Sequence, residues 1–444
     1  MSTNQEDPSS TDQANVELGG TEAQASLPEP GPGGTTEEAV LPANDDDNVE
    51  GKVKARPSEI ALCLSGGGYR AAMFHVGVLL RLNHDGILRH LSRISCVSGG
   101  SITGACLGMN WDEIWKGTSG SVADSKRLQT YLVKPLRDLT ATTIDRPSIL
   151  RGLLWFGTVH NYVTQYYENL LFKDKTLQDL PTEQAGIAPR FVLNATNVKT
   201  GTLWRFAKPY MADYRTGKFL NPKTKLSVVV AASSAFPPFL SPLKLRLEDY
   251  ENPTGGAENP LPFSRDLVLT DGGTYDNLGL QPVRGFGTLL VSDAGLKWED
   301  DPNPWTDWFN HMRRVLAIID SQVRAQRLIN LMASFTTGKR RGGYWGISTE
   351  MEAFVKANNK NNAENANKGL PPNPFTPLCC YKDARGISMA VPTRLAEMSD
   401  LEQEALINWG FAICDASLRV FCRNAFPGKA ITISDNATFP YPRP

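Results

Sequence analysis

The 444-residue sequence has no long hydrophobic segment, because its longest uninterrupted run of apolar side chains contains five residues. A transmembrane helix needs roughly 18 or more, so no membrane-spanning segment is predicted. Residues 1–7 also lack the basic and apolar regions of a signal peptide. We therefore expect a cytoplasmic protein, or one that binds peripherally to a membrane.

Histidine and cysteine are scarce, at five and seven residues. No pair of histidines has metal-ligand spacing with a nearby carboxylate, and the adjacent Cys379 and Cys380 lack the spacing of a zinc site. An odd number of cysteines in a chain without a secretion signal predicts reduced thiols. The sequence therefore predicts no metal site.

Basic residues are almost absent from the first part of the chain. Residues 1–56 contain 12 acidic and three basic side chains and almost no aromatic ones, which predicts a disordered acidic tail. The remainder carries 43 basic and 35 acidic residues, so it is net +8 while the whole chain is net −1. This excess suits an anionic membrane surface, although a solvated charged face is the commoner explanation.

One short stretch has the form of a nucleophile elbow. In CVSGGS, residues 96–101, an apolar strand over 93–97 runs directly into a helix of very small residues. In such an elbow the serine occupies a strained turn with its hydroxyl exposed, and its neighbours must be small. The pattern predicts Ser98 as a nucleophile at the end of a strand.

Two further glycine-rich segments also follow predicted strands. SGGGYR, residues 65–70, comes after the apolar run 60–64 and precedes an apolar helix over 71–82. DGG, residues 271–273, follows a strand over 267–270. In an open parallel sheet, ligands bind where loops converge at the carboxyl ends of the strands. We therefore expect the three segments to share one site.

Acyl transfer gives each segment a chemical role. A serine hydroxyl needs an adjacent base to take its proton, and Asp271 is the candidate. Backbone N–H groups stabilise the negative charge that develops on a carbonyl oxygen, by roughly 3 to 4 kcal/mol for one donor. Gly66, Gly67 and Gly68 can supply such an oxyanion hole, since glycine lets the backbone approach a ligand and a helix N-terminus follows.

These motifs, SGGGxR, then xxSxG, then DGG, resemble those of the patatin-like phospholipases. These are lipid acyl hydrolases, related to the catalytic domain of cytosolic phospholipase A, that use a Ser/Asp dyad. The stretch AASSAFPP, residues 231–238, is similar to a further block of that family. The resemblance spans at least residues 58–294. Where the family usually has glycine two residues before the serine, this sequence has Cys96.

The resemblance implies that Ser98 is the nucleophile, Asp271 the base and Gly66–Gly68 the oxyanion hole. Arg70 matches the basic residue after the glycine loop, which makes it a candidate for substrate binding. Dyad catalysis implies no metal or organic cofactor. It also implies a lipid or membrane-surface substrate and no nucleic acid, and it leaves protein partners unknown.

The histidines favour a dyad over a triad. An α/β-hydrolase triad runs Ser, Asp or Glu, then His along the chain. Only His311 follows Asp271, and it lies in a predicted helix, 310–335, rather than in a loop at a strand end. His75 is best explained as a hydrogen-bonded residue on a core helix.

Simpler explanations exist for each candidate residue. The glycine loop could bind a phosphate, but no Lys-Ser or Lys-Thr follows it and the GxGxxG spacing is absent. Asp271 could bond its own backbone in a turn. Asp276 and Asp293 are rival carboxylates, better explained as a turn and a strand end. Arg70 could pair with a surface acid.

The helix after Ser98 provides an independent argument. Gly100, Gly104 and Gly108 recur every four residues and so form one face, although each lowers helix stability by about 1 kcal/mol relative to alanine. Close packing of this helix against the sheet would explain these glycines.

A second cluster, at 339–345, is basic. A solvated turn is its simplest explanation, with lipid-phosphate contact as the alternative.

We expect a three-layer α/β/α patatin-like fold with a mainly parallel central sheet over residues 57–444. Residues 110–188 predict a helical insertion that includes an aromatic-rich stretch at 149–156 and could be a lid or ordinary core helices. The expected activity is hydrolysis of fatty-acyl esters of phospholipids or lysophospholipids. The alternatives are a catalytically silent lipid-binding module and an esterase for a soluble acyl substrate.

Overall fold

The computed structural model describes residues 54–144, 159–237, 240–247, 250, 266–296, 300–378 and 381–442. Two predictions fall outside these ranges. They are the acidic tail, apart from its last three residues, and the aromatic-rich stretch 149–156. Within the described ranges, no helix has both the length and the apolar character that crossing a bilayer requires.

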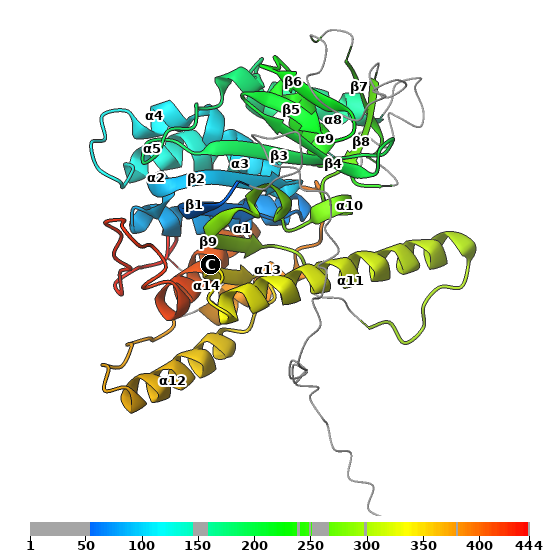
Figure 1. Ribbon diagram of the computed structural model, residues 1–444. Helices are drawn as coiled ribbons and strands as arrows, with labels where there is room; N and C mark the ends of the chain where they lie inside the picture. Colours follow the sequence, from blue (N-terminus) through cyan, green and yellow to red (C-terminus); the bar gives the residue numbers. More distant parts are fainter. Residues whose placement is uncertain are drawn as a thin grey trace, which may run out of the picture. The chain divides into compact units, whose positions relative to one another are not determined.

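Five parallel strands form the centre of the sheet (Figure 1). Their order is β10 (Arg341–Gly346), β9 (Phe286–Asp293), β1 (Arg56–Leu64), β2 (Leu91–Val97) and β3 (Arg190–Asn197). The last five residues of β1 are fully or almost fully buried, as expected for a parallel strand covered on both faces. The predicted α/β fold with a parallel central sheet is confirmed.

Antiparallel strands extend the sheet beyond β3. On one side follow β4 (Thr202–Ala207), β5 (Tyr210–Asp213) and β6 (Gly217–Leu220). A second branch consists of β8 (Asp266–Asp271), which pairs with β3, and β7 (Leu243–Arg246). The sequence did not indicate that β8 runs antiparallel to β3.

The register along β3 brings two chain segments end to end. The last residue of β2, Val97, pairs with Asn194, and the next residue of β3, Ala195, pairs with Asp271 at the end of β8. The two strands approach along the same edge of β3 from opposite directions. Ser98 and Asp271 therefore meet head to head, rather than at a shared edge of parallel strands.

One face of the sheet is covered by α1 (Gly68–His84), α3 (Gly99–Met109) and α14 (Asp400–Phe421). The α1 and α14 helices pack very closely, because a Cβ at Gly77 would lie 1.9 Å from the carbonyl oxygen of Ile407. The Ser399 side chain caps α14 in a capping box with Glu402, as the sequence predicts.

The glycines of α3 lie against three successive strands. A Cβ at Gly100 would be 2.3 Å from the Leu64 oxygen of β1, and one at Gly104 would be 2.3 Å from Cys96 Sγ of β2. At Gly108 it would be 3.3 Å from the Phe191 ring of β3. The predicted close packing of this helix on the sheet is thus present.

The opposite face of β1 and β9 carries a smaller apolar cluster. Here α11 (Trp308–Thr336) packs Leu331, with Leu328 and Phe335, against residues such as Cys63 and Val291. Only the second half of this 29-residue helix makes these contacts, and Figure 1 shows the first half projecting past the strands.

Helices dominate the described part of residues 110–188. They are α4 (Trp111–Trp115), α5 (Ser125–Leu128), η1 (Gln129–Val133), α6 (Lys134–Thr140), α8 (Val159–Tyr167), η2 (Glu168–Phe172) and η3 (Leu177–Asp179). The α8 helix packs on α9 (Leu226–Ser233). The remaining helices are α2 (Ile87–His90), α10 (Gly273–Asp276), η4 (Gln281–Val283), α12 (Met351–Asn367) and α13 (Tyr381–Ala390). The turn predicted at 339–345 was wrong in part, because Arg341 begins edge strand β10.

Candidate active site

Ser98 occupies the turn between β2 and α3 in a strained conformation. Its φ is 51° and its ψ is −118°, which side chains with a Cβ rarely adopt. The carbonyl oxygen of Ser98 accepts hydrogen bonds from the amides of Ser101 and Ile102, so the turn is held by the first turn of α3. The residue is 7% exposed. This is the geometry of a nucleophile elbow.

The carboxyl group of Asp271 lies beside Ser98, close enough for the serine side chain to lower its pKa. One carboxylate oxygen accepts a 2.6 Å hydrogen bond from the amide of Gly273. Burial, with a smaller contribution from the negative charge of Asp320, raises the pKa of Asp271 to about 7 against the lowering effects of the Gly273 amide and the Ser98 side chain. A carboxylate that titrates near neutral pH suits a general base.

The glycine loop lies directly against the serine. A Cβ on Gly66 would be only 3.1 Å from Ser98 Cβ, so no larger residue fits there without displacing the serine or Asn277. The Gly66 amide donates to the Asn277 carbonyl oxygen at 3.2 Å. Gly67 and Gly68, with φ of 144° and 62°, begin α1. Their amides belong to the first turn of a helix, where N–H groups have no intrahelical partner.

A buried serine, Ser233 at the end of α9, joins these segments. Its hydroxyl accepts a 3.0 Å hydrogen bond from the Ser98 amide and donates a 2.6 Å bond to the Asn194 carbonyl oxygen. Its own carbonyl oxygen accepts from the Gly272 amide, next to Asp271. Ser233 therefore contacts both the nucleophile turn and the aspartate turn.

Arg70 is buried, and its guanidinium donates to main-chain oxygens. The hydrogen bonds run to Ala294 at 2.9 and 3.2 Å and to Val391 at 3.1 Å. Burial lowers its pKa to about 10. These bonds tie the glycine loop to the ends of β9 and α13, and they orient the guanidinium toward the protein interior.

The rival groups have other partners. His75 is fully buried between Ser292 Oγ and the Ser65 carbonyl oxygen, and burial lowers its pKa to about 4. It is the hydrogen-bonded core residue that the sequence predicts. Asp276 accepts from the Gln281 amide, and Asp293 forms an ion pair with Arg324 at 2.5 Å. His311 is exposed on α11.

Cys96 replaces the expected glycine without positive φ. Its Sγ fills the space beside Gly104, and burial raises the pKa of its thiol. The glycine that permits close packing here is Gly104 on the facing helix α3, so β2 and α3 still pack closely at the elbow.

The predicted insertion reaches the site through Tyr167 at the end of α8. Its hydroxyl lies 3.3 Å from Ser234 Oγ, and burial together with the charge of Asp271 raises its pKa. Among the described residues, no group of three or more His, Cys, Asp or Glu side chains is arranged to hold a metal ion.

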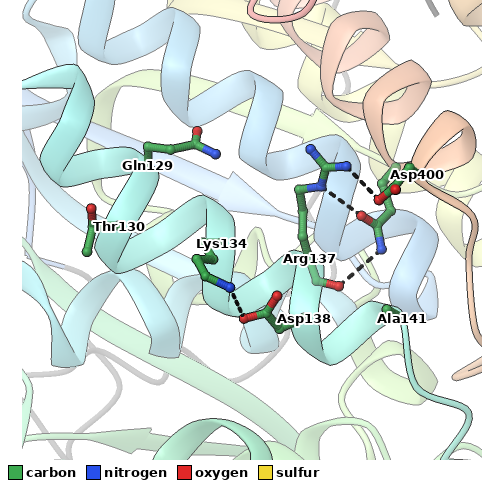
Figure 2. A pocket seen from close by; sticks show the side chains of 8 residues that line it. Gln129, Thr130, Lys134, Arg137, Asp138, Ala141 and Asp400 are labelled. Atoms are coloured by element: carbon green, nitrogen blue, oxygen red, sulfur yellow. Dashed lines mark hydrogen bonds and ion pairs between the residues drawn. The ribbon is translucent and has the colours of Figure 1, made fainter.

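A cavity of about 330 Å³ that is lined mostly by polar and charged residues lies elsewhere, between α6 and the start of α14 (Figure 2). Its charged side chains are paired, Lys134 with Asp138 and Arg137 with Asp400. None of its lining residues comes from the three candidate loops. It does not contribute to the site.

The sequence pattern did not assign roles to Ser233, Asn277 or Asp320. Ser233 lies in the AASSAFPP stretch, whose resemblance to a family block was the available signal. Nothing in the sequence indicated that Asn277 would accept from the Gly66 amide or that Asp320, on a distant helix, would act on Asp271.

Comparison with known proteins gives one family and several distant structures. Residues 62–284 match the family described as patatin-like phospholipase. Human GIVD cytosolic phospholipase A2 in complex with methyl gamma-linolenyl fluorophosphonate is 17% identical, with a TM-score of 0.32 over 54% of this chain and 41% of that one. The same human enzyme in complex with this inhibitor and terbium chloride is 13% identical, with a TM-score of 0.41 over 82% of this chain and 58% of that one.

VipD from Legionella pneumophila is 13% identical, with a TM-score of 0.27 over 82% of this chain and 84% of that one. The chain spans about half the length of the human phospholipase chains that it matches. No curated protein sequence matches it. Ser98, Asp271 and the glycine loop all lie within the residues that match the family.

Proposed function

Because the chain belongs to the patatin-like phospholipase family of lipid acyl hydrolases, we propose that it cleaves fatty-acyl esters of phospholipids or lysophospholipids through a Ser98/Asp271 dyad. The observation that carries the proposal is that Ser98, in its positive-φ turn, lies beside Asp271, a buried carboxyl group whose pKa is raised to about 7 and on which the Ser98 side chain acts. Nucleophile and base are then in contact before substrate binds.

In the first half-reaction, Ser98 Oγ attacks the ester carbonyl carbon while its proton passes to the Asp271 carboxylate. A tetrahedral intermediate forms with negative charge on the former carbonyl oxygen. The C–O bond to the glycerol or lysolipid then breaks, and Asp271 returns its proton to the leaving alkoxide. The product is an acyl-enzyme with the fatty acid esterified to Ser98.

In the second half-reaction, Asp271 removes a proton from a water molecule that attacks the acyl-enzyme. The intermediate collapses, Ser98 Oγ leaves and recovers the proton, and the fatty acid is released. Atoms and charges balance with the ester and one water molecule, so the dyad requires no cofactor.

The proposed oxyanion donors are the Gly67 and Gly68 amides at the N-terminus of α1. The positive end of this 17-residue helix adds to their effect. Gly66 has a different role, because its amide donates to Asn277 while its missing Cβ leaves space for Ser98. Arg70 then stabilises the loop through its hydrogen bond to the Ala294 carbonyl oxygen.

Hydrolysis of phosphatidylcholine vesicles and of a short-chain soluble ester by wild type, Ser98→Ala and Asp271→Asn tests the proposal. Both variants should lose about 10³-fold or more of either activity while their circular dichroism is unchanged. Ser348→Ala, which removes an equally buried serine outside the three loops, is the matched control and should remain active. Near-normal turnover by Ser98→Ala would contradict the mechanism, and activity on the soluble ester alone would contradict the lipid substrate.

A further inference from the structure

The first half of α11 exposes an unusual amount of apolar surface. Ten of the nineteen large apolar side chains that are exposed within the described ranges lie between residues 305 and 332. Trp305 and Trp308 are 73% and 77% exposed. Apolar patches of this kind mark interaction surfaces, because a monomeric soluble protein rarely keeps them in water.

The exposed residues form a continuous stripe on the helix. Trp308, Met312, Leu316, Ile319 and Val323 follow one another at spacings of four, four, three and four residues, so they share one face. An amphipathic helix of a soluble protein normally turns such a face toward the core. In α11 it faces solvent.

A second stripe attaches α11 to the proposed active site. Arg327 donates a 2.9 Å hydrogen bond to the Tyr275 carbonyl oxygen, four residues after Asp271. Arg324 bonds to Asp293 and to the carbonyl oxygens of Gly295 and Leu296, at the end of β9. The charge of Asp320 reaches Asp271. Arg324 and Arg327 therefore hold α11 near the end of β9 and near Tyr275, while the apolar side chains of its first half are exposed to solvent.

The exposed segment is better suited to insertion into a membrane interface than to packing against another helix. Val315 to Ile319 are five consecutive apolar residues, and all five are exposed. At 100° per residue they cover every side of the helix. A partner helix covers one stripe, whereas the interfacial region of a membrane can surround the segment. No helix in the described ranges is long and apolar enough to cross a bilayer, so the segment would lie in the interface.

Charge favours an anionic surface. Residues 305–341 contain seven Lys or Arg residues and two Asp residues, and five basic residues are left when Arg324 and Arg327, which pair with Asp293 and Asp276, are set aside. Of these five, Lys339 and Arg341 are exposed after the helix ends. Glu299, Asp300 and Asp301 precede the segment, together with Lys297, and reduce this excess without reversing it, since residues 297–341 contain eight basic and five acidic side chains. Tryptophans such as Trp305 and Trp308 are typical of the membrane–water boundary.

From these observations we infer that the apolar stripe of α11 inserts into an anionic phospholipid membrane and so holds the dyad at the lipid surface. This inference rests on the proposed function, because it explains how lipid esters would reach Ser98. Insertion buries apolar side chains that water otherwise surrounds, and the basic residues of the segment attract the phosphate groups of the lipids electrostatically.

The test measures binding to vesicles by the Ser98→Ala variant, which leaves the lipid intact. It should co-sediment with vesicles of phosphatidylcholine plus phosphatidylserine more strongly than with phosphatidylcholine alone. Adding L316Q and I319Q should weaken this binding by about tenfold or more, the ratio expected when two partly inserted apolar side chains are lost. The matched control adds L220Q and L370Q, whose side chains are equally exposed elsewhere, and should bind like the parent.

In the active protein, L316Q/I319Q should lower the ratio of vesicle to soluble-ester hydrolysis by a similar factor. Equal vesicle binding by parent and L316Q/I319Q would overturn the inference. So would sedimentation velocity that shows a dimer dissociated by L316Q/I319Q while vesicle binding is unchanged, because α11 would then join two copies. Vesicle binding does not require catalysis, so failure of the dyad mechanism remains distinguishable from failure of the docking surface.

Discussion

The amide of Ser98 donates a hydrogen bond to Ser233 Oγ at 3.0 Å, and this bond holds the strained turn from outside its own strand and helix. Ser233 Oγ uses its proton for the Asn194 carbonyl oxygen, so the 2.8 Å contact with Ser101 Oγ must be donated by Ser101. One buried hydroxyl thus satisfies three groups around the elbow. We regard Ser233 as a positioning residue.

Ser233→Ala should lower kcat for the soluble ester by about 10- to 100-fold, because the backbone strain of roughly 1–3 kcal/mol at Ser98 loses its outside support. KM should change little. Ser227→Ala is the matched control, since Ser227 lies buried on the same helix and its hydroxyl has no hydrogen-bond partner in the described part of the chain. A kcat that is equal in the two variants would contradict a positioning role.

The pH dependence of kcat/KM should follow Asp271. The base must be ionised, so activity should be low in acid and rise through a pH of about 7. Asp320→Asn removes a negative charge that raises this pKa and should move the rise to lower pH. Stopped-time assays on a soluble ester across the pH range measure the kcat/KM profile of the wild type and of Asp320→Asn. A profile that stays in place in Asp320→Asn would contradict the electrostatic contact.

The raised pKa of Asp271 also predicts a stability effect. The folded state holds this proton more tightly than the unfolded state, whose value is near 3.8, so stability is lost as pH rises from about 4 to 7. Asp271→Asn has no proton to lose and should be more stable than wild type at pH 8, by at most about 4 kcal/mol. The difference should shrink in acid. Urea unfolding at both pH values tests this, and a difference independent of pH would exclude it.

Gly67→Ala should impair the proposed oxyanion hole. Its φ of 144° is strained for any residue with a Cβ, and that Cβ would lie 3.1 Å from Ala71 Cβ and 3.2 Å from the Ala294 oxygen. We expect kcat to fall by about 100-fold, the effect of misplacing one donor. Gly120→Ala, where a Cβ meets nothing within 4 Å, should retain activity. Wild-type kcat in Gly67→Ala would remove this amide from the mechanism.

Cys96 and Gly104 should behave as an energetically coupled pair. Gly104→Ala places a Cβ against the Cys96 sulfur, and Cys96→Gly leaves a cavity, so each should lower the free energy of unfolding. Combining the two relieves the clash and fills the space. A double-mutant cycle should give a favourable coupling of about 1–2 kcal/mol, whereas strictly additive effects would show that the two sites are independent.

Much of the site could be predicted because short-range features determine it. The glycine loop and the elbow each combine a strand, a turn that requires small residues, and a helix, and all of these are visible in sequence. The meeting of Ser98 with Asp271 could not be derived from the strand pattern alone. It depends on β8 running antiparallel to β3 and ending one pair beyond Val97, and periodicity contains no information about strand partners.

The exposure of the apolar residues of α11 could not be predicted from the sequence, for a related reason. The helix from 310 to 335 was predicted from its periodic pattern, but this pattern is the same whichever face meets the protein. Arg324 and Arg327 decide the orientation through partners on β9 and α10, which are distant in sequence. Arg70 likewise matches a family position, but its partners, Ala294 and Val391, are known only from the fold.

Reaction with a fluorophosphonate tests the central claim most directly, because only an activated serine forms the covalent phosphonate adduct. Intact-mass measurement followed by peptide mapping should find one adduct in the wild type, on Ser98, and none in Ser98→Ala, with labelling strongly slowed in Asp271→Asn. An adduct that persists in Ser98→Ala, or that maps to another serine, would contradict the assignment of Ser98 as the nucleophile.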